Sequence, residues 1–439
     1  MQEGARMGSS MTFVATGDSF ITRRLPDRSS ESFRSIANLI GEAEFRFTNL
    51  EVTTHRLEGF PFAFSGGTWA MAQPEVLADL QAYGFNIMAW ANNHTMDYAY
   101  GGLEATRKYL DEYGISHAGV GLNLAEASQP VYLDCPSGRV ALVAATSTFH
   151  ESWIAGEQRP DMPGRPGVNP LRYETTYTLP QEDFAHLDRI SRLIPINASY
   201  NLDVKEGFAV PSNGTSIRFG AHRFVAGEAA ACTTVPVDAD KQRMLRSISE
   251  AKRQADYVIV SIHSHEMEGE NKAASAAFFE SMARACIDGG ADAVLGHGPH
   301  ILRGIEIYRN RPIFYSLGNF IFQNETVHRL PADFYEKYSL GHEATVADAF
   351  DTRTDHNKKG LGVNPYVWES VIPYWRMEDG RLKELLLYPI ELGYGTLRYQ
   401  RGWPTLSKQK KILEHLQELS EPYGTKIEWE NGVGKVLID

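Results

Sequence analysis

The feature that most limits the fold of this sequence is the alternation of short apolar runs with amphipathic stretches. The runs 11–16, 45–50 and 140–146 are rich in β-branched or aromatic residues, as is typical of buried strands. Between the first two runs lies 32–44, in which apolar residues recur with the period of an α-helix. Strands that alternate with helices build parallel sheets covered by helices, so the sequence predicts an α/β fold.

The same patterns predict further elements along the chain. The expected helices are 74–83, 103–113, 181–193, 241–253, 274–287 and 409–419. The expected strands are 85–91, 257–262 and 292–295, with hairpins at 304–308/313–317 and 368–377/381–390. Residues 325–364 are polar and rich in His and Asp, and we expect a loop there.

Repeated prolines interrupt this alternation between residues 150 and 236. Proline cannot continue a helix, so this spacing argues against long helices in most of the segment and indicates loops or an insertion, although 181–193 can still form one helix. Two interpretations are open for 150–236: an elaborated surface insertion, or a lid that covers the substrate.

Composition excludes several classes of function. The chain has 43 Lys and Arg against 55 Asp and Glu, a formal net charge of −12, which argues against binding of nucleic acid. An anionic substrate, small or polymeric, is still compatible if a few arginines or metal ions hold it. The three cysteines are too few for a disulfide scaffold or a four-cysteine zinc site. Without an apolar stretch long enough for a signal peptide or a membrane span, we expect a cytoplasmic protein with no membrane insertion; the oligomeric state is not indicated.

Polar clusters stand at the ends of the predicted strands. They are Gly17-Asp18, Asn49-Leu50-Glu51, Asn92-Asn93-His94 with Asp97, His263-Ser264-His265-Glu266, Gly296-His297-Gly298-Pro299-His300 and Ser316-Leu317-Gly318-Asn319. Each motif alone is compatible with a simple turn. Ligands of α/β sheets bind where the strands end, however, so the clusters should converge on one rim. Carboxylate, imidazole and amide groups without thiolate suit Mn, Fe, Zn or Co, and a bridging carboxylate allows two ions about 3.5–4 Å apart.

In order and spacing, these motifs resemble the CapA family of capsule and poly-γ-glutamate biosynthesis proteins, a branch of the calcineurin-like metallophosphoesterase superfamily. The resemblance covers residues 11–325. It implies a four-layer αββα sandwich of the metallophosphoesterase type, with 150–236 as a Pro-rich insertion. Residues 326–439 are expected to complete the same domain as a small C-terminal extension with a polar loop, a hairpin and a helix.

The resemblance also implies a role for individual residues. Asp18 and His300 would bind a first metal ion, Glu51 would bridge both ions, and Asn93, His263 and His297 would bind the second. His94 would protonate the leaving group, and Asp97 would orient His94.

The sequence departs from the superfamily pattern at two positions. The superfamily carries a histidine two residues after the first aspartate, where this chain has Phe20, so the first metal site loses a ligand. His265 replaces part of an aromatic-glycine pair found in many CapA-like proteins. It is either an added ligand or a residue that orients a neighbouring ligand, and the second interpretation is favoured. Arg24 and Asn319 are further candidates for contact with the substrate.

The sequence therefore predicts a soluble hydrolase with two divalent ions of Mn, Fe or Zn. A hydroxide that bridges the ions would attack an amide bond of γ-glutamyl type, or a phosphoester bond, in an anionic substrate, with His94 as general acid. The alternative is a non-catalytic accessory protein of polymer synthesis. The pair of His94 and Asp97 favours the enzyme, because a structural metal site needs no acid beside its ligands.

Overall fold

A computed structural model describes residues 10–211 and 215–438, and two large β-sheets form its centre. The larger sheet contains ten strands: β1 (Ser10–Phe20), β2 (Phe45–Leu50), β5 (Ile87–Ala89), β6 (Ser116–Ala118), β21 (Asn319–Phe322), β22 (Glu369–Glu378), β23 (Arg381–Glu391), β24 (Thr405–Leu406), β25 (Ile427–Glu430) and β26 (Val433–Val436). Its order is β25-β26-β23-β22-β1-β2-β5-β6, with β21 beside β1 and β24 beside β23. The fold is mixed α/β, as the sequence predicts.

The smaller sheet contains six strands: β8 (Val131–Cys135), β9 (Gly138–Thr146), β15 (Tyr257–His263), β18 (Ala293–His297), β19 (Ile305–Tyr308) and β20 (Arg311–Phe314). Its order is β19-β20-β18-β15-β9-β8. The two sheets share one buried cluster, in which Phe13 of the larger sheet stacks on Trp375 and meets the ring edge of Tyr257 from the smaller sheet. Val14, the next residue of β1, belongs to a different cluster, because successive side chains of a strand point to opposite faces.

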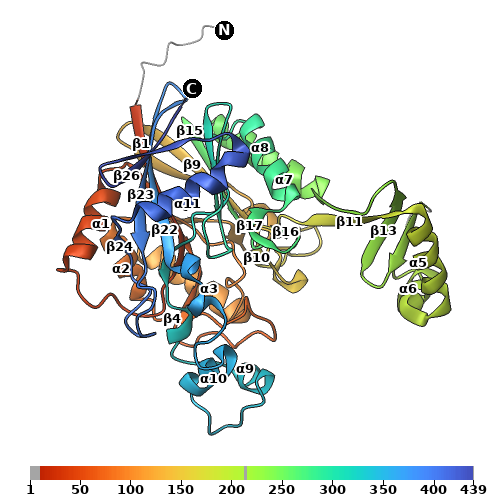
Figure 1. Cartoon of the computed structure of the whole chain (residues 1–439). Helices are drawn as coiled ribbons and strands as arrows, with labels where there is room; N and C mark the ends of the chain where they lie inside the picture. The colour runs from red at the N-terminus through yellow and green to blue at the C-terminus, as the bar shows by residue number, and fades with distance from the viewer. Residues whose placement is uncertain (1–9, 212–214, 439) are drawn as a thin grey trace.

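Helices cover the other face of each sheet. The larger sheet packs in one cluster with α1 (Glu31–Gly41), α2 (Val76–Tyr83) and α3 (Ala99–Glu112), and the smaller sheet packs in another with α7 (Asp238–Lys252) and α8 (Ala277–Asp288). Figure 1 shows α1 and α2 on one side of the body and α7 and α8 on the other. The pattern of α1 explains its orientation, because Phe33, Ile36 and Ile40 are all buried on one stripe and Ser30 caps its first turn.

The segment after β9 forms an arm that projects from the body (Figure 1). Its sheet has the order β12-β13-β11-β14, built from β11 (Tyr173–Pro180), β12 (Ser216–Phe219), β13 (His222–Gly227) and β14 (Ala231–Pro236). Two helices, α5 (Gln181–Leu193) and α6 (Ala198–Glu206), accompany this sheet. The helix predicted at 181–193 is confirmed. The strands around it were not predicted, and Pro180, Pro195 and Pro236 stand at the ends of elements rather than inside them.

The polar segment 325–364 is also more ordered than expected, since it contains α9 (Ala332–Lys337) and α10 (Val346–Thr354). Two aromatic side chains, Phe334 and Phe350, are buried and hold these helices against the body. Thr345 and Asp348 form a capping box at the start of α10, which is a signal present in the sequence. The chain then adds the predicted hairpin β22–β23, the helix α11 (Lys410–Ser420) and the hairpin β25–β26.

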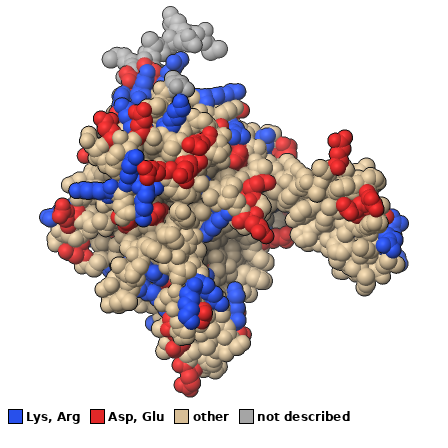
Figure 2. All heavy atoms as spheres, in the orientation of Figure 1, with Lys and Arg blue, Asp and Glu red and all other residues tan. Residues whose placement is uncertain are grey.

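On the face shown in Figure 2, positively and negatively charged side chains are interspersed. Each helix within the described residues is too short or too polar to cross a bilayer.

Candidate metal centre

The parallel strands deliver the polar motifs to one place between the two sheets. Strands β1, β2 and β5 are parallel neighbours in the larger sheet, and β15 and β18 are parallel neighbours in the smaller one. The register pairs Asp18 with Asn49 and with Asn319, and pairs His263 with His297. The motif side chains from both sheets are buried there: Asp18, Glu51, Asn93, His94, Asp97, His263, His297 and His300.

Two groups of potential metal ligands lie side by side. Asp18, His263 and His297 form one group, and Glu51, His265 and His300 form the other, with the ligand atoms of each group within 4.8 Å of one another. His263 joins them, because its Nδ1 lies 3.7 Å from Asp18 Oδ1 and its Nε2 lies 3.7 Å from Glu51 Oε1.

This grouping differs from the expected one in three ways. Asp18 lies with His263 and His297, which were expected to bind the other ion. His265 lies within the second group itself, whereas the sequence analysis favoured a role in which His265 only orients a neighbouring ligand. His300 groups with Glu51, although its Nδ1 lies at the same 3.8 Å from a carboxylate oxygen of Asp18 and of Glu51.

The histidine rings face one another through their nitrogens. Nδ1 of His263 lies 2.9 Å from Nδ1 of His297, and Nε2 of His263 lies 3.1 Å from Nε2 of His265. Burial lowers the pKa of His297 and of His300 to about 3, and it lowers the pKa of His263 and His265 well below the usual value. The rings are therefore neutral at pH 7, which is the form that binds metal ions.

Three buried oxygen atoms at the cluster have no hydrogen-bond partner among the described residues: both carboxylate oxygens of Glu51 and Oδ1 of Asn93. Leaving such an acceptor unsatisfied costs about 1–3 kcal/mol. Burial raises the pKa of Glu51 well above its usual value, with the charges of Asp18 and Asp97 adding to the effect, and burial raises the pKa of Asp18 to about 7. Divalent cations would satisfy these oxygens and favour both ionised carboxylates, so the donor set fits two metal ions.

Hydrogen bonds from neighbouring residues hold the side chains of the first group in place. Asn49 Nδ2 donates to Asp18 Oδ1 at 2.7 Å, and the Gly298 backbone N–H donates to Asp18 Oδ2 at 2.9 Å. Ser261 Oγ lies 2.7 Å from His297 Nε2, which leaves Nδ1 of His297 for the cluster. Gly298 has φ of 122°, and a Cβ there would lie 3.0 Å from the Ser264 backbone, so the close approach requires glycine.

Asn319 supports the second group rather than facing the open space expected of a substrate contact. Its Oδ1 lies 2.9 Å from His300 Nδ1, and its Nδ2 donates to the carbonyl oxygens of His300 and Val367. All of its polar atoms are thus used within the protein. His300 itself has φ of 59°, a strained conformation for a residue with a side chain, of the kind that recurs at functional sites.

His94 and Asp97 form a buried pair at the edge of the cluster. The Nδ1–H of His94 donates to Asp97 Oδ2 at 2.7 Å, because an ionised carboxylate can only accept. Asp97 also accepts hydrogen bonds from the backbone N–H groups of Gly66 and Ala70. The other ring nitrogen of His94, Nε2, lies 4.0 Å from Glu51 Oε1 and so faces the metal ligands.

Two neighbours complete the surroundings of His94. Phe20 meets the His94 ring edge-on with centroids 5.0 Å apart. Gly66 lies so close that a Cβ would be 2.8 Å from His94 Cε1 and 2.4 Å from Asn93 Nδ2. Sequence reasoning missed Gly66, because a Gly-Gly pair reads as an ordinary turn and nothing in its spacing links it to His94.

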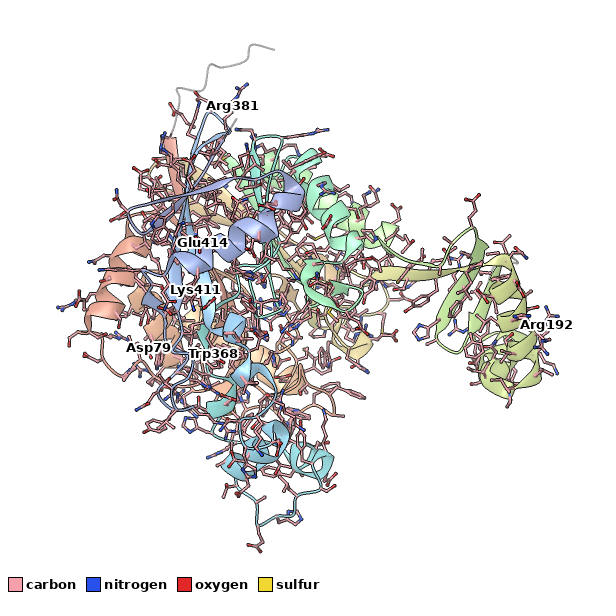
Figure 3. The ribbon with its side chains drawn as sticks, viewed as in Figure 1. Asp79, Arg192, Trp368, Arg381, Lys411 and Glu414 are labelled. Carbon is pink, nitrogen blue, oxygen red and sulfur yellow. The ribbon has the colours of Figure 1, made fainter. Side chains whose placement is uncertain are left out.

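The structure does not bring Arg24 to the cluster. Its guanidinium binds the buried carboxylate of Asp79 on α2, with Nε 2.6 Å from Oδ2, and Arg28 binds the same carboxylate (Figure 3 labels Asp79). The charge of Arg24 is therefore compensated within the protein.

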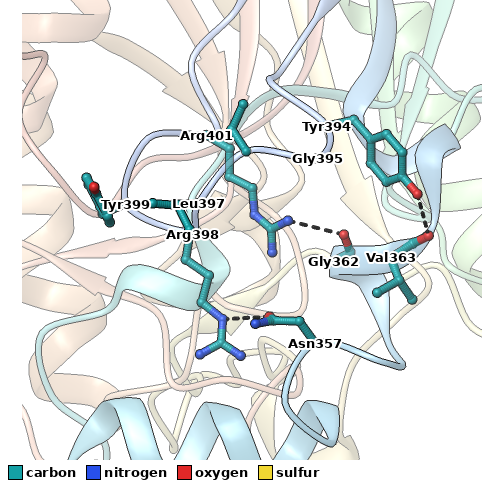
Figure 4. Close-up of a pocket in the computed structure, with 10 residues that line it drawn as sticks. Asn357, Gly362, Val363, Tyr394, Gly395, Leu397, Arg398, Tyr399 and Arg401 are labelled. Carbon is teal, nitrogen blue, oxygen red and sulfur yellow. Dashed lines mark hydrogen bonds between the residues drawn. The ribbon is translucent and has the colours of Figure 1, made fainter.

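A separate pocket of about 480 Å³ lies in the C-terminal part of the chain (Figure 4). Arg398 and Arg401 line it and donate to Asn357 and to the carbonyl oxygen of Gly362. Both arginines also form ion pairs with acidic residues, so the pocket offers no uncompensated charge from these two side chains. It shares no residue with the two ligand groups.

Comparison with known proteins gives consistent matches. The model of the family described as "Bacterial capsule synthesis protein PGA_cap" matches residues 12–324. The uncharacterized protein y4sH of Sinorhizobium fredii is 38% identical over 440 residues, covering 97% of this chain and 93% of that protein. The capsule biosynthesis protein CapA of Bacillus anthracis is 27% identical over 255 residues, covering 57% of this chain and 43% of the relative. The PGA biosynthesis protein CapA of Bacillus subtilis is 34% identical over 206 residues, covering 43% and 52%. The segment 12–324 contains every member of the two ligand groups.

Proposed function

This chain belongs to the bacterial capsule synthesis protein family PGA_cap, and from that premise we propose that it is a metal-dependent hydrolase. The observation that carries the proposal is the set of six potential ligands, all buried except the half-buried His265, with the unsatisfied carboxylate oxygens of Glu51 beside a hydrogen-bonded pair of His94 and Asp97. The proposal extends to the fold: the two sheets and their covering helices make the four-layer αββα sandwich of the metallophosphoesterases. The shared core between the sheets and the separate helix-bearing cores outside them support that arrangement.

In this proposal two divalent ions of Mn, Fe or Zn occupy the centre. Asp18, His263 and His297 would hold one ion and His265 and His300 the other, while Glu51, whose oxygens lie near histidines of both groups, would serve both ions. Asn93 offers its unpaired Oδ1 as a further ligand. His265 is thereby assigned as a direct ligand. When bound, such ions supply Lewis-acid polarisation of a carbonyl or phosphoryl oxygen and lower the pKa of water.

The side chains of this protein perform the remaining steps. His94 donates a proton from Nε2 to the leaving group, which is an amine for an amide bond and an alkoxide for a phosphoester. Asp97 fixes the ring by accepting from Nδ1–H and stabilises its cationic form. The backbone N–H groups that bind Asp97 keep the pair rigid before the substrate arrives.

The substrate we propose is anionic, with an amide bond of γ-glutamyl type ranked above a phosphoester. Support for this ranking comes from two similar proteins, whose names refer to capsule biosynthesis and to PGA biosynthesis.

The test combines metal analysis with a substrate panel. Protein loaded with each of Mn, Fe and Zn is assayed for bound metal, for cleavage of γ-linked oligoglutamate and for cleavage of p-nitrophenyl phosphate. We expect close to two ions per chain and turnover of one substrate class. Protein that holds both ions and cleaves neither substrate would instead support the non-catalytic accessory role.

A further inference from the structure

Two positively charged side chains lie beside the ligand groups without a carboxylate partner. Lys272 belongs to β17 (Asn271–Ser275), which forms a hairpin with β16 (Met267–Glu268) directly after the motif that contains His265. Arg303 follows His300 along the chain. Within residues 10–211 and 215–438, no carboxylate oxygen lies within 4.0 Å of either cationic group.

Lys272 is half-buried, and its positive charge acts on two of the proposed ligands. Burial and the charge of Lys272 both lower the pKa of His300, and Lys272 also contributes to the lowered pKa of His265. The pKa of Lys272 is lowered by burial and by the neighbouring charge of Arg303. The Lys272 ammonium group is thus destabilised by burial and by a second cation, and among the described residues it forms no ion pair with a carboxylate.

Arg303 is buried, with 1% of its surface exposed, and two backbone carbonyls hold it. Its Nε donates to the carbonyl oxygen of Lys272 at 3.1 Å, and its Nη2 donates to the carbonyl oxygen of His265 at 3.5 Å. Its Nη1 is buried with no hydrogen-bond partner among the described residues. Arg303 therefore ties the hairpin of Lys272 to the His265 motif.

The net charge of the two ligand groups, together with Lys272 and Arg303, favours binding of an anion. The two ligand groups contain two carboxylates, Asp18 and Glu51, which compensate only half of the charge of two divalent ions. Lys272 and Arg303 add two further positive charges, and of these two only Arg303 is attracted by a carboxylate, that of Glu266. A partly desolvated cation without an anionic partner is costly, so an anion that pairs with Lys272 would be stabilised here.

We propose that Lys272 binds an oxyanion group of the substrate next to the bond cleaved at the metal centre, with Arg303 as a positioning residue for the hairpin. The group is a carboxylate in an oligoglutamate or the phosphate of an ester, since both offer the same charged oxygens. This inference rests on the proposed function and specifies which part of the substrate the protein recognises.

The experiment measures anion binding by calorimetry rather than turnover. Metal-loaded protein is titrated with γ-linked triglutamate and, separately, with inorganic phosphate. Lys272→Gln should weaken binding of at least one of these anions by roughly 10–100-fold, the scale of a lost charge-assisted hydrogen bond near a low-dielectric site. Loss for triglutamate alone identifies a carboxylate site, and loss for phosphate alone identifies a phosphate site.

The matched control is Lys410→Gln, a surface lysine on α11 that pairs with Glu414 (labelled in Figure 3) and is 57% exposed. It should bind both anions as the parent protein does, and Lys272→Arg should retain most of the affinity. Metal content and thermal unfolding are measured for each variant. If Lys272→Gln does not fold, Lys272→Met, which keeps the apolar stem, takes its place.

The two proposals fail in different ways. Unchanged affinity for both anions in Lys272→Gln, or no binding of either anion by the parent protein, overturns the anion site. Binding that depends on Lys272 in a protein that cleaves neither substrate supports the anion site while the hydrolase proposal fails.

Discussion

Glu51 differs from Asp18, the other carboxylate of the ligand groups, because it accepts no hydrogen bond from any described residue. Both of its oxygens lack a partner, one of them lies 3.7 Å from His263 and the other lies 3.8 Å from His300. It therefore reaches histidines of both ligand groups, whereas His265 belongs to one group.

We accordingly expect Glu51→Gln to lower metal content and turnover more than His265→Ala. The glutamate neutralises both ions, and a neutral amide cannot replace it. Loss of His265 removes one neutral donor from one ligand group and leaves the charge of the centre unchanged, so its effect should be smaller. Metal stoichiometry and turnover of both variants, prepared with the same metal supply, give the comparison. If His265→Ala loses an ion while Glu51→Gln keeps two, Glu51 is not a bridging ligand.

His94→Gln should reduce turnover by roughly 10²–10⁴-fold, the usual contribution of a general acid, and leave the metal content nearly intact. Glutamine keeps a polar group of similar length but cannot deliver the proton. The measurement is turnover per bound metal ion. Parallel loss of metal and activity would identify His94 as a ligand instead.

Most of the candidate site could be predicted from the sequence, because each ligand follows a recognisable strand and parallel strands end at one edge. The position of His265 could not be predicted, because its distance from Glu51 depends on how the chain turns after β15. The roles of Gly66 and Arg303 could not be predicted from the sequence either. They depend on contacts between segments that are distant in the chain, and such contacts leave no periodic pattern in the sequence.

At the scale of elements, the attachment of the arm to the body depends on Asp240 of α7. This fully buried carboxylate accepts two hydrogen bonds from the guanidinium of Arg172, at the start of the arm, and one from Arg243. Burial alone would raise the pKa of Asp240, but the two arginines outweigh it and lower the pKa below its usual value.

Asp240→Asn should therefore lower the free energy of unfolding by about 3 kcal/mol at pH 7, the low end of the range for a broken buried ion pair, because Arg172 is partly exposed. A carboxyl with a lowered folded pKa contributes stability above its unfolded pKa of 3.8, and the contribution disappears as the pH falls through the folded pKa. Urea unfolding of both proteins should thus differ at pH 7 and converge below pH 3.8. Asp238→Asn, an exposed aspartate on the same helix, is the control, and an equal effect of both variants would contradict this role.

The secondary structure of the arm could be predicted from the sequence only in part. The amphipathic pattern predicted α5, although none of its residues is buried in the described structure. The strands β11 to β14 were missed, since their residues are mostly half-exposed and their apolar alternation is weak. The same reasoning missed α9 and α10, whose buried aromatics stand among many polar residues.

At the scale of the whole molecule, the ligand groups connect the two sheets, because Asp18 and Glu51 come from the larger sheet and His263 and His297 from the smaller one. Metal ions bound there should stabilise the folded chain as a whole. Removal of metal by a chelator should lower the midpoint of thermal unfolding, since a ligand at a hundredfold excess over its Kd adds about 2.7 kcal/mol. Calorimetry with and without added metal checks this, and Glu51→Gln should respond less. Identical midpoints in both conditions would contradict a shared metal centre.

The position of β1 has a consequence for how the chain is made. This strand carries Asp18, and its neighbours are β2, synthesised soon after it, β21, which begins at Asn319, and β22, which begins at Glu369. At about 5–20 residues per second, a ribosome needs on the order of 20–70 s to supply the last of these neighbours. Through that interval the edge of the nascent β1 is open to pairing with other chains, as unprotected strand edges are. The strand that carries Asp18 therefore acquires its full set of neighbours only late in synthesis, after every ligand of the candidate centre has been made.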